Sequence, residues 1–113
     1  MHGMRLTMKK KIVVHVEDSR DWRETLQEFL EDEGYTVISC SSLAEALPYF
    51  AQAKVVILDG TIDEPNDGFD FADAYNGRKT IVIFSDNDEK RSNRPQFKKS
   101  ALDSLLRWLK ENI

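Results

Sequence analysis

Short apolar runs alternate along this chain with stretches in which apolar residues recur at helical spacing. The runs are rich in Val and Ile and are bounded by polar residues, which is typical of strands buried in a parallel sheet. Four runs are clear and a fifth is weaker; they span residues 12–16, 35–40, 54–58, 80–84 and 96–98. This alternation predicts one α/β domain, a doubly wound, five-stranded parallel sheet in a three-layer sandwich.

Capping signals place the first two helices. Ser19 precedes an amphipathic stretch, and Gly34 lies just past its end, so a helix is predicted between them. Ser42 and Glu45 form a capping-box pattern for the second helix. Pro48 lies inside that second pattern and has no amide hydrogen, so we expect this helix to be kinked or short.

The remaining helices follow the third and fifth strands. A polar loop over residues 60–67 leads to a short helix over residues 68–75. Ser100, with Asp103 three residues later, is predicted to open the last helix. The core stripe of that helix is formed by Leu102, Leu105, Leu106 and Leu109.

Composition and charge narrow the class of protein. The 113 residues suffice for one domain, predicted to span residues 9–113 after a flexible N-terminal extension over residues 1–8. No apolar run is long enough to span a membrane, and a net charge of −4 argues against a nucleic-acid binder. The single cysteine, Cys40, fits a reducing compartment, so a cytoplasmic protein is expected.

Three carboxylates follow two of the predicted strands. Glu17 and Asp18 end the first run, and Asp59 ends the third. Ligands of open α/β sheets bind beyond the carboxyl ends of the strands, so these side chains should converge if the two strands are neighbours. Three like charges in one pocket are unfavourable unless a hard cation neutralises them, which predicts a Mg²⁺ site.

Two further residues at strand ends complete a pattern that resembles the response-regulator receiver domains of two-component signalling. The pattern consists of Glu17 and Asp18 after the first strand, Asp59 after the third, Ser85 after the fourth and Lys99 after the fifth. The resemblance covers nearly the whole chain. It implies a flavodoxin-like sheet in the strand order 2-1-3-4-5.

The resemblance also implies a function: phosphorylation of Asp59 by a histidine kinase or a histidine phosphotransferase. Asp18, Asp59 and the Thr61 backbone carbonyl would hold Mg²⁺, with Glu17 acting through water. Ser85 and Lys99 would contact the phosphoryl group. A phosphoacceptor of this kind is not an enzyme in the usual sense, apart from slow self-catalysed dephosphorylation.

Several positions depart from the family's pattern. Asp86 stands where a small residue is usual, and its carboxylate would repel an incoming phosphoryl anion. Only 13 residues separate Ser85 from Lys99, so the helix that receivers place there is predicted to be truncated or absent. Gln96 stands where many receivers have an aromatic switch residue, and Phe97 should point to the other face.

Two alternative functions remain open. A degenerate receiver that is never phosphorylated would act as an interaction module alone, as Asp86 and the shortened region suggest. The run from Leu58 to Ile62 also resembles part of the haloacid-dehalogenase phosphatase signature, but Ile57 stands where that signature needs its nucleophilic aspartate.

As a stand-alone receiver, the chain is expected to signal by binding an unknown downstream protein. Trp108, beside the leucine stripe of the last helix, is either peripheral core or an exposed anchor, and we expect that flank to bind a partner or a second copy as a weak homodimer. His15, inside the first strand, is expected to be a buried, hydrogen-bonded core histidine.

Overall fold

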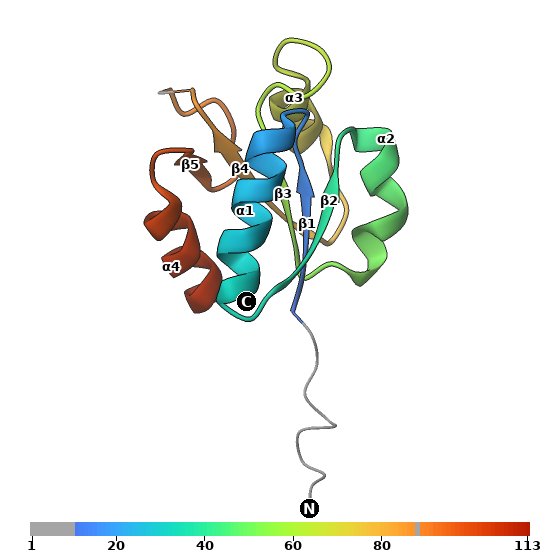
Figure 1. The fold of residues 1–113 in the computed structure, drawn as a ribbon. Coiled ribbons are helices and arrows are strands. Elements are labelled where there is room, and N and C mark those ends of the chain that lie inside the picture. The colour runs from blue at the N-terminus through green and yellow to red at the C-terminus, as the bar shows by residue number, and fades with distance from the viewer. Residues whose placement is uncertain (1–10, 88) are drawn as a thin grey trace, which may run out of the picture.

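A five-stranded parallel sheet forms the centre of the computed structural model, which describes residues 11–87 and 89–113. Its strand order is β2-β1-β3-β4-β5, which confirms the order expected from the sequence (Figure 1). The strands are β1 (Ile12–Val16), β2 (Thr36–Cys40), β3 (Val55–Leu58), β4 (Thr80–Ser85) and β5 (Gln96–Lys98). The predicted extension over residues 1–8 lies outside the described residues.

Helices cover both faces of the sheet, as predicted. They are α1 (Arg20–Asp32), α2 (Leu43–Ala46), the 3₁₀ helix η2 (Leu47–Gln52), α3 (Asp67–Ala74) and α4 (Leu102–Asn112). Successive strand residues point to opposite faces, so β1 contributes Val14 to the core under α2, η2 and α3, and Val13 to the core under α1 and α4. Figure 1 shows α1 and α4 together on one side of the sheet.

The helix ends follow the capping signals in the first half of the chain. The Ser19 hydroxyl accepts a hydrogen bond from Trp22 N, and Gly34 ends α1 with a φ of +94°. The Ser42 hydroxyl accepts one from Glu45 N. Because Pro48 has no N–H, the second helix continues from Leu47 as a tighter 3₁₀ helix, which confirms the predicted irregularity.

Two helix starts differ from the prediction. Ser100 does not cap the last helix, because a turn in which Ala101 N donates to Lys98 O shifts the N-cap to Ala101, which has no side-chain cap. The third helix begins at Asp67 rather than Gly68, since Asn66 takes the left-handed conformation, with a φ of 63°, directly before it.

No helix occurs in the described residues between β4 and β5, which are 86, 87 and 89–95; the predicted loss of that helix is confirmed. Hydrogen bonds instead hold the loop between β4 and β5 against the end of α3. The Arg94 guanidinium donates to Ala72 O at 3.1 Å and to Tyr75 O at 2.7 Å. The buried Ser92 hydroxyl donates to Asp73 at 2.9 Å.

Within the described part of the chain, none of the helices combines the length and apolar character that crossing a membrane requires.

Candidate functional site

The carboxyl ends of β1 and β3 lie side by side in the sheet. Val16 pairs with Leu58, and Asp59 N donates to Val16 O at 3.0 Å, so Asp59 follows directly beside Glu17. One carboxylate oxygen from each of Glu17, Asp18 and Asp59 lies within 4.8 Å of the others. The predicted convergence of the three carboxylates is therefore present.

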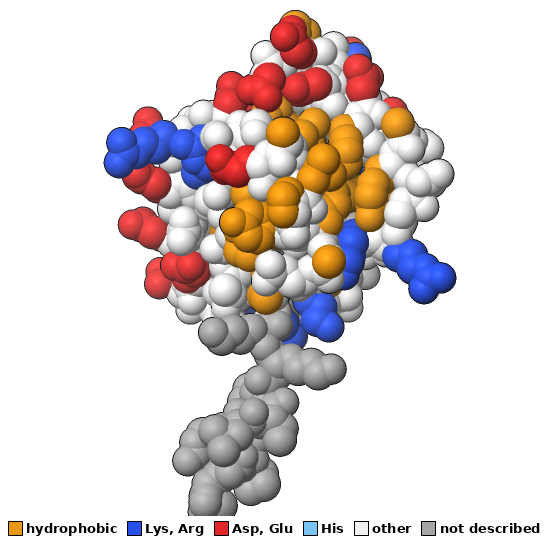
Figure 2. Space-filling model, turned by 90° about the vertical axis from the view of Figure 1, so that its right-hand side faces the viewer, with side chains coloured by type: hydrophobic (Ala, Val, Ile, Leu, Met, Phe, Trp, Pro, Cys, Tyr) orange, Lys and Arg blue, Asp and Glu red, His pale blue; other side chains and the backbone are white. Residues whose placement is uncertain are grey.

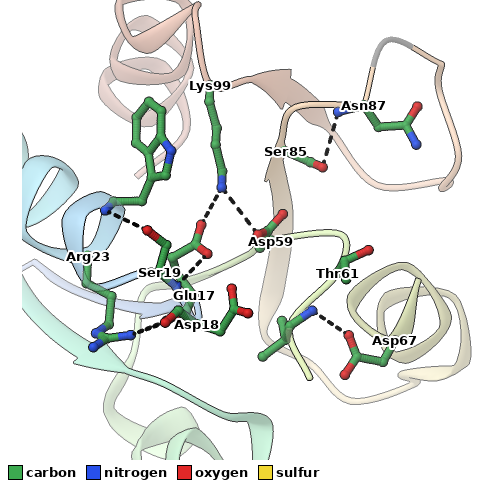
Figure 3. A network of polar contacts seen from close by, with 12 residues as sticks. Glu17, Asp18, Ser19, Arg23, Asp59, Thr61, Asp67, Ser85, Asn87 and Lys99 are labelled. Atoms are coloured by element: carbon green, nitrogen blue, oxygen red, sulfur yellow. Dashed lines mark hydrogen bonds and ion pairs between the residues drawn. The ribbon is translucent and has the colours of Figure 1, made fainter. Parts of the chain in front are cut away.

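Lys99, which follows β5, extends its side chain into this cluster (Figure 3). Its Nζ lies 2.6 Å from Glu17 Oε1 and 3.3 Å from Asp59 Oδ2. The ammonium also lies 5.1 Å from the ring centroid of Trp22, within reach of a cation–π contact. Lys99 and Glu17 are both buried, so their charges interact with little screening by solvent.

The electrostatics of this pair are dominated by burial and by their mutual contact. Burial raises the pKa of Glu17 to about 7, although the hydrogen bonds from Lys99 and Ser19 N oppose that rise. Burial alone would lower the pKa of Lys99, but contact with Glu17 and Asp59 raises it overall. Lys99 is therefore a fixed positive charge at this end of the sheet.

A cavity of about 360 Å³ opens beside Asp59. Its lining consists of Asp59, Thr61, Phe69, Ser85, Asp86, Asn87 and Lys99. The buried Ser85 hydroxyl accepts a hydrogen bond from Asn87 N at 3.3 Å, and the Asp86 side chain is exposed. The cavity is thus lined by a carboxylate from Asp59, a hydroxyl from Ser85 and an ammonium from Lys99.

The loop after β1 is held by Arg23, a residue that the sequence analysis did not single out. Its guanidinium donates to Glu17 O at 2.7 Å and to Asp18 O at 2.9 Å (Figure 3). Ser19 N donates to the Glu17 carboxylate at 3.0 Å. Arg23 and Trp22 were missed because nothing in their helical spacing indicates that the first turn of α1 faces the acidic pair.

The loop after β3 is held by Asp67, which was predicted only as a polar loop residue. Its carboxylate accepts hydrogen bonds from the backbone N–H groups of Ile62, Asp63 and Glu64 at 2.6, 2.9 and 3.1 Å. Gly68 brings α3 against Asp59, since a Cβ built at Gly68 would lie 1.8 Å from Asp59 O. The glycine is therefore needed for the approach of backbone to backbone.

The donor set fits Mg²⁺. Carboxylate and carbonyl oxygens are the protein ligands that this cation prefers, and it commonly binds through one or two carboxylates while keeping several waters. Asp18 is exposed and Asp59 lines the cavity, so both are accessible to a hydrated ion, whereas Glu17 is buried and occupied by Lys99. Thr61 lies in the cavity lining, and its hydroxyl accepts a hydrogen bond from Asn66 N.

His15 is a fully buried core residue of β1, as predicted. Neither ring nitrogen has a hydrogen-bond partner in the described part of the chain, so the hydrogen bonding expected from the sequence is not found. Burial, with smaller contributions from the positive charges of Lys99 and Arg23, lowers its pKa to about 3. His15 is therefore a neutral core residue at neutral pH.

Comparison with known proteins identifies the fold. No protein-family model and no curated protein matches the sequence. Among solved structures, the chain is similar to the chemotaxis protein CheY4 of Vibrio cholerae, with 21% identity, a TM-score of 0.77, and coverage of 93% of this chain and 100% of that one.

Two other solved structures are similar to the chain over most of its length. The response regulator TrrA of Thermotoga maritima, solved with Mg²⁺ and beryllium fluoride, has 23% identity and a TM-score of 0.76 over 91% of this chain and 99% of that one. A receiver domain protein of Bacillus halodurans has 15% identity and a TM-score of 0.71 over 93% and 98%. The chain has the fold of response-regulator receiver domains.

Proposed function

We propose that this chain is a response-regulator receiver that accepts a phosphoryl group on Asp59 from a phosphohistidine of a kinase or phosphotransferase. The observation that carries the proposal is the Asp59 carboxylate, which lines an open cavity between an acidic cluster and the Lys99 ammonium. The receiver fold of the similar structures supports it. In this proposal the modified domain signals by binding another protein.

The reaction is a displacement at phosphorus. One oxygen of Asp59 forms the new P–O bond while the P–N bond to the donor histidine breaks, and the imidazole leaves with that electron pair and takes up a proton. Asp18 and Asp59, with the Thr61 carbonyl, are the proposed Mg²⁺ ligands, and Glu17 would act through water. When bound, Mg²⁺ would neutralise negative charge on the carboxylate and phosphoryl oxygens.

Lys99 and Ser85 take the remaining roles. The Lys99 ammonium is already 3.3 Å from Asp59, so it is placed to pair with an oxygen of a phosphoryl group on that residue. The Ser85 hydroxyl, which lines the same cavity, is a donor for a second oxygen. Both groups are fixed before any ligand arrives, which favours stabilisation of developing charge.

A second candidate is a receiver fold that acts as an interaction module without phosphorylation. The observation that favours it is Asp86, whose carboxylate lines the cavity where an anion must enter. The dehalogenase-type phosphatase is not proposed, because Ile57 is a buried core residue at the position of that signature's nucleophile.

The test is phosphorylation by a small donor. Purified protein is incubated with acetyl phosphate and Mg²⁺ and followed by intact mass; we expect one added phosphoryl group in the wild type and none in Asp59→Asn or with a chelator present. Trp22 lies 5.1 Å from the Lys99 ammonium, so beryllium fluoride should also change tryptophan fluorescence.

Two outcomes would contradict the proposal. Equal labelling of Asp59→Asn, with its fold verified by circular dichroism, would exclude Asp59 as the acceptor. A wild type that neither incorporates phosphate nor responds to beryllium fluoride would favour the unphosphorylated interaction module.

A further inference from the structure

The largest exposed apolar side chains of the described residues lie together on η2. Leu47 is 50% exposed and Tyr49 is 38% exposed, and the exposed Pro48 lies between them in the chain. Figure 2 shows apolar side chains gathered across this face of the molecule. None of these three residues lines the cavity beside Asp59, which lies at the carboxyl edge of the sheet.

The apolar surface continues from η2 onto α3. Phe50 of η2 makes edge-to-face contacts with Phe71 and Tyr75, at ring-centroid distances of 5.9 and 6.0 Å, so the two helices are in direct contact. Phe71 and Tyr75 are half-buried, and the Arg94 guanidinium lies over the Tyr75 ring, 5.9 Å from its centroid. We call the surface formed by Leu47, Pro48, Tyr49, Phe71 and Tyr75 the η2–α3 face.

Charges of opposite sign lie at the two ends of this face. Exposed acidic residues lie toward the carboxyl edge of the sheet, at the start of α2, in the loop after β3 and in the first turn of α3: Glu45, Asp63, Glu64 and Asp70. Basic residues lie at the opposite edge, where β3 and β4 begin: Lys54, Arg78 and Lys79. Figure 2 shows acidic side chains above the apolar surface and basic ones below it, with further acidic side chains and a basic one along the left flank.

With an acidic end and a basic end, the η2–α3 face can complement the same face of a second copy. We propose that the η2–α3 face binds a second copy of this chain about a two-fold axis that lies in the interface, crosses the apolar surface and runs perpendicular to the line between its acidic and basic ends. A two-fold interface places each residue of a patch opposite a different residue of the same patch. The rotation therefore sets the acidic end of each copy against the basic end of the other, with Leu47 and Tyr49 covered between them.

The alternative surface predicted from the sequence is less suitable for this role. Trp108 is half-buried and lies against Phe97, with ring centroids 6.4 Å apart, at the margin of the core under α1 and α4. It is therefore a peripheral core residue, and its truncation would loosen the packing of α4. The dimer proposal does not depend on phosphorylation of Asp59 and goes beyond the proposed function.

The first test compares two lysine substitutions by sedimentation velocity over a range of protein concentrations. Leu47→Lys adds a charge at the most exposed large apolar side chain of the η2–α3 face, and we expect it to weaken self-association at least about tenfold. Ser104→Lys adds the same charge at an exposed position of α4 and should leave association unchanged. A monomeric wild type at all concentrations, or equal association of the two variants, would overturn the proposal.

The second test uses the charged ends. Lys54→Glu and Glu64→Lys should each weaken self-association, and the double variant should restore it, because opposite charges again face each other across the axis. Restoration identifies a second copy as the occupant. Two single variants that weaken association without restoration in the double variant would overturn the two-fold arrangement, and effects on a different protein but not on self-association would assign the face to that protein.

Discussion

Lys99 places a buried positive charge at the cavity beside Asp59. Its ammonium pairs more closely with Glu17, at 2.6 Å, than with Asp59, at 3.3 Å, and it rests against the Trp22 ring. A phosphoryl group on Asp59 would offer this ammonium a stronger partner than the carboxylate alone. The same side chain that stabilises buried Glu17 is thus placed to respond to modification of Asp59.

Asp86 sets the charge at the mouth of the cavity. Replacing it with Asn removes a negative charge from the cavity lining, so we expect Asp86→Asn to accelerate labelling by acetyl phosphate by about threefold at low salt. The gain should shrink as ionic strength rises, because salt screens exposed charges. The measurement is the initial rate of phosphoryl incorporation by mass.

The control for this prediction is Asp103→Asn, which makes the same charge change at an exposed position of α4 outside the cavity lining. Equal acceleration by both variants would indicate an effect of net charge alone. Unchanged labelling of Asp86→Asn would show that its carboxylate does not face the donor.

The element that most directly shapes the site is the loop between β3 and α3. It begins after Asp59, and its course is fixed by the hydrogen bonds that the Asp67 carboxylate accepts from the loop backbone and by the close approach of Gly68 to Asp59 O. Thr61, the proposed carbonyl ligand, lies inside this closed arrangement. The loop is therefore a structural support for Asp59 rather than a simple connection.

Asp67→Asn tests that support. Burial alone would raise the pKa of Asp67, but backbone hydrogen bonds lower it overall, so its ionised form stabilises the fold above the unfolded value of about 3.9. Asn retains one acceptor oxygen, and we expect a loss of about 1 kcal/mol in the unfolding free energy at pH 7. The difference should vanish as the pH falls through the folded pKa of Asp67, which urea denaturation at several pH values will measure.

Asp70→Asn is the matched control, because both aspartates lie in the first turn of α3 and share its helix-end charge effect. If the two variants lose the same stability with the same pH dependence, the helix end and not the loop hydrogen bonds accounts for the effect.

The elements could be predicted from sequence wherever one local signal dominates. The apolar runs gave all five strands, and Ser19, Gly34 and Ser42 gave helix ends, because burial and capping act within a few residues. The predicted start of α4 at Ser100 was wrong because Ser100 lies in a turn that follows the end of β5. The loop between β4 and β5 was predicted to lose its helix, but its attachment to α3 through Arg94 depends on contacts far apart in sequence.

The candidate site likewise combines residues that local sequence signals predict with residues that they do not. Glu17, Asp18, Asp59, Ser85 and Lys99 each lie at the end of a strand, so the topology of the sheet brings them together as expected. Arg23, Trp22 and Asp67 contribute through the orientation of a side chain on a helix, which periodicity does not specify. The environment of His15, whose ring nitrogens have no hydrogen-bond partner among the described residues, is likewise a property of tertiary packing, since strand pairing sets Ser39 and Ile57 beside it in the sheet.

For the molecule as a whole, Mg²⁺ binding at the acidic cluster would link ligand binding to global stability. Lys99 offsets part of the repulsion through Glu17 and Asp59, while Asp18 is exposed and lies outside those two ion pairs. Mg²⁺ that binds the folded state and not the unfolded chain must stabilise the fold by mass action. At a concentration ten times its Kd the gain is about 1.4 kcal/mol, or roughly 5 °C in Tm for a domain of this size.

Asp18→Asn should separate the two contributions. It removes one carboxylate from the cluster, so the metal-free protein should unfold at a higher temperature than the wild type, while the Mg²⁺-induced rise in Tm should shrink because a ligand is lost. Thermal unfolding with and without Mg²⁺, at ionic strength matched with NaCl, measures both effects together. A wild-type Tm that does not respond to millimolar Mg²⁺ would count against the metal site, and a variant that responds as strongly as the wild type would remove Asp18 from the ligand set. A metal-binding cluster predicts both changes, a higher Tm without Mg²⁺ and a smaller rise in Tm with it. The same repulsion among the carboxylates that destabilises the metal-free fold also provides the affinity for the cation.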